Sequence, residues 1–188
     1  MKTTLLAALS FALASSAQSA IVFFDILGKA GSGLRAANEN PATTGGTGGE
    51  VGAGISFDDV SKLLTINIAW GSANGFTNLT GNATAGHLHG PTTSGGTASF
   101  TENGGALAGL DSLTGWNSSS TSGGINNGTL TLTAPQEAAL LAEKTYINIH
   151  TAANGGSEMR GNLVLVPEPS HAILSFLGLA ALSARRKR

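Results

Sequence analysis

Several short segments of this chain alternate apolar and polar residues, the pattern of a β-strand with one buried face. In residues 51–57, VGAGISF, every second side chain from Val51 to Phe57 is apolar, and residues 62–70, KLLTINIAW, alternate again from Leu64 to Trp70. Asp58-Asp59 lies between the two segments and favours a turn. The pattern predicts a hairpin whose apolar face, Trp70 included, lies in a core.

The composition favours short strands over long helices. The 188 residues include 27 glycines, whereas only 5% are aromatic and 11% are charged. The chain has no cysteine, which excludes disulfides, a thiolate nucleophile and a cysteine zinc site. It has no Gly-x-Ser-x-Gly motif either, and no catalytic residue is predicted.

Further strands and one short helix complete the expected fold. Residues 21–27 and 128–133 are predicted strands, and residues 92–124 are expected to form long loops around a weak strand at 98–101. A helix is expected after Thr133, which can cap it, with Pro135 in its first turn. The predicted fold is all-β: an antiparallel Greek-key-like sandwich or flattened barrel with one short helix, plus hydrophobic helical segments at both termini.

The last predicted hairpin has one polar face. Residues 145–150, TYINIH, place Ile147 and Ile149 on one face and Tyr146, Asn148 and His150 on the other. In residues 158–166, EMRGNLVLV, the apolar side chains of Met159, Leu163 and Leu165 are expected inward. Outward-facing side chains beside His150 are then expected to be Glu158, Arg160 and Asn162.

Three of the four histidines form a candidate metal site. Alternation puts His87 and His89 on one face of a strand, and His150 can supply a third nitrogen if its strand lies nearby. Three imidazoles and a water molecule suit zinc or copper, and a copper centre can be redox-active.

The alternative is structural. The histidines and Asn148 could bond backbone groups, and Glu158 and Arg160 could form a surface ion pair. Glu158 could also orient a ligating imidazole by a hydrogen bond.

The first residues are typical of a secretory signal peptide. Lys2 precedes an apolar run at 5–14, and Ala17-Gln18-Ser19 fits a small-x-small cleavage pattern. The expected division of the chain is a signal peptide at 1–19, a β domain at 20–166 and a sorting tail at 167–188.

The tail contains three parts in order: a Pro-Glu-Pro motif, an apolar segment at 172–184 and a terminal basic cluster. Their residues are Pro167, Glu168 and Pro169, and then Arg185, Arg186, Lys187 and Arg188. This order resembles the PEP-CTERM sorting signal. The resemblance implies bacterial export, transient insertion of the apolar helix in the inner membrane, and processing by an exosortase-type membrane protease. His171 lies in this tail and is left out of the candidate site.

The charge of the expected domain differs from that of the whole chain. Residues 20–166 contain five Lys and Arg against ten Asp and Glu, a net charge of −5, whereas the whole chain carries −1. Nucleic-acid binding is not expected, because it needs a basic surface.

The middle of the chain resembles the CHRD domain, named for its occurrence in chordin. The resemblance rests on residues 35–58, RAANENPATTGGTGGEVGAGISFD, and on AGHLHGP at 85–91, TYINIHT at 145–151 and ANGGSEMRGNL at 153–163. The resemblance implies a secreted β domain. The leading hypothesis is therefore an exported, non-enzymatic binding or structural protein of the bacterial cell surface or extracellular matrix. Its partners could be exopolysaccharide or other surface proteins. The second hypothesis is a zinc or copper metalloprotein that uses His87, His89 and His150.

Overall fold

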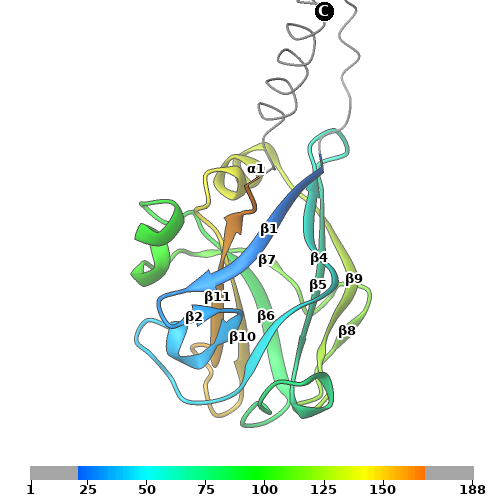
Figure 1. Ribbon diagram of the computed structural model, residues 1–188, viewed down its shortest axis with the longest axis vertical. Helices are drawn as coiled ribbons and strands as arrows, with labels where there is room; N and C mark the ends of the chain where they lie inside the picture. Colours follow the sequence, from blue (N-terminus) through cyan, green and yellow to red (C-terminus); the bar gives the residue numbers. More distant parts are fainter. Residues whose placement is uncertain (1–20, 168–188) are drawn as a thin grey trace, which may run out of the picture.

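The computed structural model describes residues 21–167, which form one β-rich body with a single α-helix (Figure 1). The expected signal peptide, the tail beyond Pro167 and their hydrophobic helical segments lie outside the described residues. Figure 1 shows that α1 and the start of β1 lie at the same end of the body.

All strands belong to one antiparallel sheet with the order β7-β6-β10-β11-β1-β4-β5-β9-β8, and β2 and β3 pair beside it. The elements in chain order are β1 Ile21–Gly28, β2 Gly31–Ser32, β3 Leu34–Arg35, η1 Ala36–Asn38, β4 Thr47–Asp58, β5 Leu63–Trp70, η2 Ser72–Asn74, β6 Ala83–His89, η3 Gly96–Thr101, β7 Ala106–Gly109, β8 Trp116–Asn117, β9 Gly124–Thr131, α1 Ala134–Leu141, β10 Tyr146–Thr151 and β11 Met159–Leu165.

Strand β1 joins the two halves of the sheet. Its first half pairs with β4 from Ile21 to Phe24, and its second half pairs with β11 from Phe24 to Leu27. Buried side chains of both halves, such as Trp70 and Ile149, belong to one hydrophobic cluster. This packing fits the predicted all-β sandwich.

The hairpin of β4 and β5 forms as predicted, but its first strand is irregular. The pairing shifts between Glu50 and Ile55, and Gly52 and Gly54 between them have φ of 57° and 67°. Only glycine adopts this left-handed region freely. The bulge turns Val51 to the surface, so the prediction that it faces the core was wrong, whereas Phe57 is buried as expected.

The predicted helix is present as α1. Thr133 and Gln136 form a capping box at its start, and Leu140 is buried while Leu141 is 37% exposed. The helix has eight residues, and no helix within residues 21–167 is long and apolar enough to cross a bilayer.

The strand expected at 98–101 is instead part of the 3-10 helix η3. The buried Ser99 hydroxyl donates to the Gly96 carbonyl, and Asn162 of β11 donates 2.9 Å to the Ser99 hydroxyl oxygen. Contacts with a distant strand therefore decide the local conformation, which a local pattern cannot predict.

Candidate metal centre

Strands β6 and β10 bring the three predicted histidines together. The strands are antiparallel neighbours in which His87 lies opposite Asn148, and His89 lies opposite Tyr146. The intervening side chains Leu88, Ile147 and Ile149 are fully buried in the core. Alternation therefore places His87, His89 and His150 on the other face of the sheet, and we call them the three-imidazole cluster.

The three rings are close enough to share one ion. One nitrogen from each ring can be chosen so that all three lie within 4.8 Å of one another. The ring centroids of His87 and His150 are 4.8 Å apart, and those of His87 and His89 are 5.5 Å apart. Nitrogen ligands of a tetrahedral zinc ion lie about 3.3 Å apart, since zinc–nitrogen bonds are about 2.0–2.1 Å. Binding of one ion would therefore require the side chains to rotate inward, so that the three nitrogens come closer together.

Backbone carbonyls fix the tautomers of two rings. Nδ1 of His89 donates 2.9 Å to the Gly104 carbonyl, and Nδ1 of His150 donates 3.0 Å to the Gly155 carbonyl. A carbonyl oxygen only accepts, so Nε2 of each neutral ring carries a lone pair. Ligating histidines in metalloproteins use the same arrangement, in which the other ring nitrogen donates to a fixed acceptor.

The two lone pairs have different partners. Nε2 of His150 lies 2.9 Å from Nδ1 of His87, which can donate to it, whereas Oδ1 of Asn148, 3.1 Å away, is a second acceptor and gives this lone pair no hydrogen bond. Nε2 of His89 is buried and has no hydrogen-bond partner among residues 21–167. A buried acceptor without a partner costs free energy, so a cation or a water molecule is needed there.

Burial favours the neutral form of the rings. It lowers the pKa of His87, an effect that the neighbouring His150 reinforces and the Asp111 carboxylate opposes. Burial also lowers the pKa of His89, and the hydrogen bond to Gly104 offsets part of that decrease. Neutral imidazole is the form that binds a metal ion.

A stack of three side chains holds His89 in place. Its ring lies parallel to that of Tyr146 at 5.0 Å, and the Arg160 guanidinium lies 3.6 Å from the centroid of the Tyr146 ring on β10. The Tyr146 hydroxyl also donates to the Gly104 carbonyl, the acceptor of His89. These contacts restrict the orientation of the His89 ring.

The expected surface positions of Glu158, Arg160 and Asn162 were wrong. All three side chains are buried: η1 and η3 pack over β11, which carries Arg160 and Asn162, and the segments of Gly46 and Thr80 cover Glu158. Arg160 donates to the side-chain oxygens of Asn162 and Asn103 and to the Ser99 carbonyl, rather than forming a surface ion pair.

Glu158 connects loops. Its carboxylate accepts from the backbone amides of Gly46 and Thr80, from the hydroxyls of Thr80 and Thr151, and from the side-chain amide of Asn154. Backbone carbonyls orient the imidazoles of His89 and His150, whereas Glu158 bonds to the loops. The buried Asn148 lies beside His150.

Some residues at the cluster were not predicted. Gly104 and Gly155 contribute only carbonyl oxygens, which every residue has, so no sequence signal could identify them. Glu39 is buried and accepts a hydrogen bond from Ser157; burial raises its pKa, while Ser157 and the charges of Arg160 and His150 oppose that shift. Glu39 lies in residues 35–58, the first segment that resembles the CHRD domain, so that resemblance could have identified it from the sequence.

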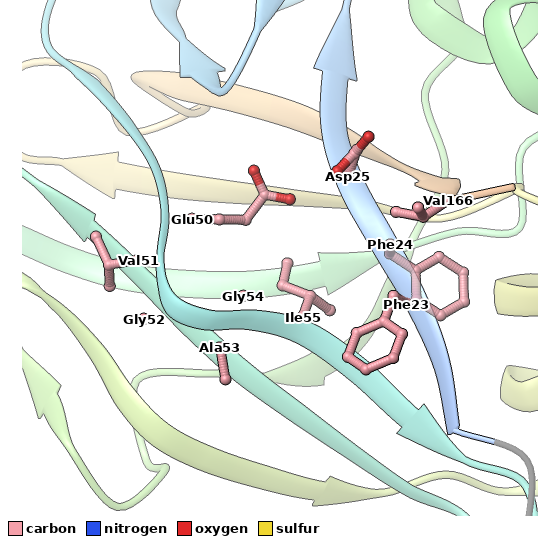
Figure 2. Close-up of a pocket in the computed structure, with 10 residues that line it drawn as sticks. All are labelled: Phe23, Phe24, Asp25, Glu50, Val51, Gly52, Ala53, Gly54, Ile55 and Val166. Carbon is pink, nitrogen blue, oxygen red and sulfur yellow. The ribbon is translucent and has the colours of Figure 1, made fainter. Parts of the chain in front are cut away.

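A separate hollow lies on the surface around the β4 bulge (Figure 2). Phe23, Asp25, Glu50 and Val166 line it, together with the bulge. Glu50 accepts 2.8 Å from the amide of Ile26, and burial raises its pKa. None of the lining residues belongs to the three-imidazole cluster.

Comparisons with known proteins identify the domain. No curated protein and no solved structure gives a significant match. The profile of the CHRD domain matches residues 31–163, well over half of the chain, and this span includes β6, β10 and the start of β11 with the motifs that bring the histidines together. This chain therefore belongs to the CHRD domain family.

Proposed function

We propose that this protein is an exported CHRD domain of the bacterial cell surface or extracellular matrix that binds a zinc or copper ion through His87, His89 and His150. The observation that carries the metal site is the buried lone pair on Nε2 of His89, beside two further imidazoles. Membership of the family suggests a non-enzymatic domain of extracellular type. We therefore assign the site to binding.

The chemistry of the donors selects the ion. Three imidazole nitrogens suit zinc and copper, whereas magnesium and calcium prefer oxygen ligands. The redox-active form of the hypothesis requires copper. Reversible reduction of a copper-loaded sample, lost in a His89→Ala variant, would support that form.

The expected result for His89→Ala is loss of metal binding. The full chain is mixed with equimolar Zn²⁺ or Cu²⁺ and desalted, and its metal content is measured. We expect about one ion per wild-type chain, and at least a tenfold weaker affinity after removal of a ligand. His171→Ala is the matched control, because His171 is outside the cluster, and it should retain the ion.

A second variant protects this test against misfolding. His150→Ala removes a half-buried ring near the surface, and circular dichroism reports whether each variant keeps its β-structure. Equal metal content in wild type and in both folded variants would contradict the proposal and leave a water molecule as the partner of His89.

Sorting to the surface is supported by the two ends of the chain. The sequence of residues 1–19 is typical of a signal peptide, and residues 167–188 carry the three parts of a PEP-CTERM-like tail in order. An exosortase-type protease would process this tail. The mature domain could then bind exopolysaccharide or other surface proteins.

Removal of Arg185–Arg188 tests the sorting proposal in the native host. The basic cluster holds the chain end on the cytoplasmic side, so without it we expect a changed mature mass and a changed location. His171→Ala leaves the three parts of the tail intact and should be processed normally. An unchanged mass and location after removal of the cluster would refute the sorting proposal.

A further inference from the structure

The three-imidazole cluster is closed on one side and open on the other. Behind it, the core side chains Leu88, Ile147 and Ile149 of β6 and β10 are fully buried. The rings of His87, His89 and His150 are each half-buried, so they lie between the core and the solvent. A ligand can reach the cluster only from its solvent side.

The protein supplies three strong donors at this point. Zinc in a protein is usually four-coordinate, and a structural site has four protein ligands, whereas three ligands leave one position for a water molecule or an external ligand. Among the His, Asp and Glu side chains of residues 21–167, the group that can converge on one ion consists of the three histidines. The two buried carboxylates nearby are committed elsewhere: Glu39 accepts from Ser157, and Glu158 accepts from the threonine hydroxyls.

The charge of the centre favours an anion at the fourth position. Neutral imidazoles add no charge, so a bound divalent ion keeps its full charge of about +2. The buried cation Arg160 lies over the ring of Tyr146, which itself stacks on the ring of His89. An anionic oxygen donor would offset this positive charge and complete a tetrahedron.

From these observations we propose that the bound ion keeps one coordination position open to solvent and takes an external carboxylate there. The proposal rests on the metal site proposed above. It gives the domain a binding chemistry: recognition of carboxylate-bearing ligands through the ion, without a chemical reaction.

Asp111 is the side chain that could close the site from within the protein. It is exposed and lies just after β7, whose Gly109 pairs with His87, and its carboxylate lies close to Gly109. An exposed side chain on a loop loses conformational freedom when it becomes a ligand, so an external carboxylate in excess competes with it. Asp111→Asn removes this internal ligand and separates the two arrangements.

Cobalt(II) absorption in the full chain tests the proposal. Cobalt replaces zinc, and its visible spectrum reports the number and kind of ligands. We expect a tetrahedral cobalt spectrum that shifts saturably when acetate is added, in wild type and in Asp111→Asn alike. Chloride at equal ionic strength is the control for acetate, and His171→Ala is the control for the variants.

Three negative results of the cobalt experiment are possible, and each has a different meaning. If cobalt binds but acetate leaves the spectrum unchanged, the open position is refuted and the metal site stands. If Asp111→Asn alters the cobalt spectrum before acetate is added, Asp111 occupies the fourth position, which also refutes the proposal. If the wild type gives no tetrahedral cobalt spectrum, the metal site itself fails.

Discussion

At the scale of single residues, the buried carboxylate of Glu158 holds several segments of the fold together through hydrogen bonds. Glu158 is fully buried, and its two oxygens accept hydrogen bonds from three separate segments, around Gly46, Thr80 and Thr151. Burial raises its pKa, but the hydrogen bonds from Thr151, Thr80 and Gly46 together outweigh burial and hold the pKa below its ordinary value. The charged form is therefore the one that the folded state prefers.

Glu158→Gln is expected to destabilise the protein by about 2–3 kcal/mol at pH 7. The variant places an NH₂ group against groups that already donate, so at least one buried donor loses its acceptor. The free energy of unfolding is measured by urea denaturation. Glu102→Gln removes a carboxylate that accepts from the amide of Ser94, and should have a much smaller effect.

The pH dependence gives a second readout of Glu158. Its pKa is lowered in the folded state, so its contribution is complete above the ordinary value of 4.5 and is lost as the pH falls below it. The difference between wild type and Glu158→Gln should therefore narrow as the pH falls below 4.5. A difference that stays constant from pH 7 to pH 3 would contradict this account.

At the scale of elements, the bulge in β4 interrupts the regular strand pairing and changes the environment of the Glu50 carboxyl group. It turns Val51 outward and places Glu50 in the hollow of Figure 2, where it accepts from the amide of Ile26. Burial raises the pKa of Glu50, and the neighbouring Asp25 adds to this shift. The charged form of Glu50 is thus disfavoured in the folded protein.

Glu50→Gln is expected to stabilise the protein at neutral pH, with a rise in Tm of about 2 °C. A raised pKa means that wild type loses stability as the pH rises above 4.5, whereas the neutral variant does not. The gain in Tm should be present at pH 8 and vanish near pH 4. Thermal unfolding at both values checks this, and a gain that is equal at pH 4 and pH 8 would contradict it.

Sequence patterns predicted the positions of strands and of the helix better than they predicted which side chains other segments cover. Alternation identified β5, β10 and β11, β-branched and aromatic residues identified β1, and Thr133 with Pro135 identified the start of α1, because these signals are local. The bulge at Gly52 and Gly54 and the burial of Arg160 depend on distant segments that pack on the strands. No local pattern contains that information.

At the scale of the whole molecule, the candidate site was predicted in part. His87 and His89 share a strand face by alternation alone, and His150 required only that β6 and β10 be neighbours, which the sheet order confirms. The carbonyls of Gly104 and Gly155, which orient the rings, come from loops that no pattern could place. The metal ion and its fourth ligand stay predictions for experiment.

The position of β1 has a consequence for the order in which the fold can form. β1 is the first strand of the domain and β11 is the last, yet they are hydrogen-bonded neighbours, and β1, with the short β3 beside it, links the two halves of the sheet. In the export route proposed here, β1 leaves the cytoplasm first and must wait for nearly the whole domain before its partner arrives. In that route the pairing of β1 with β11 could form only after nearly the whole domain had crossed, and such long-range pairing is intrinsically slow.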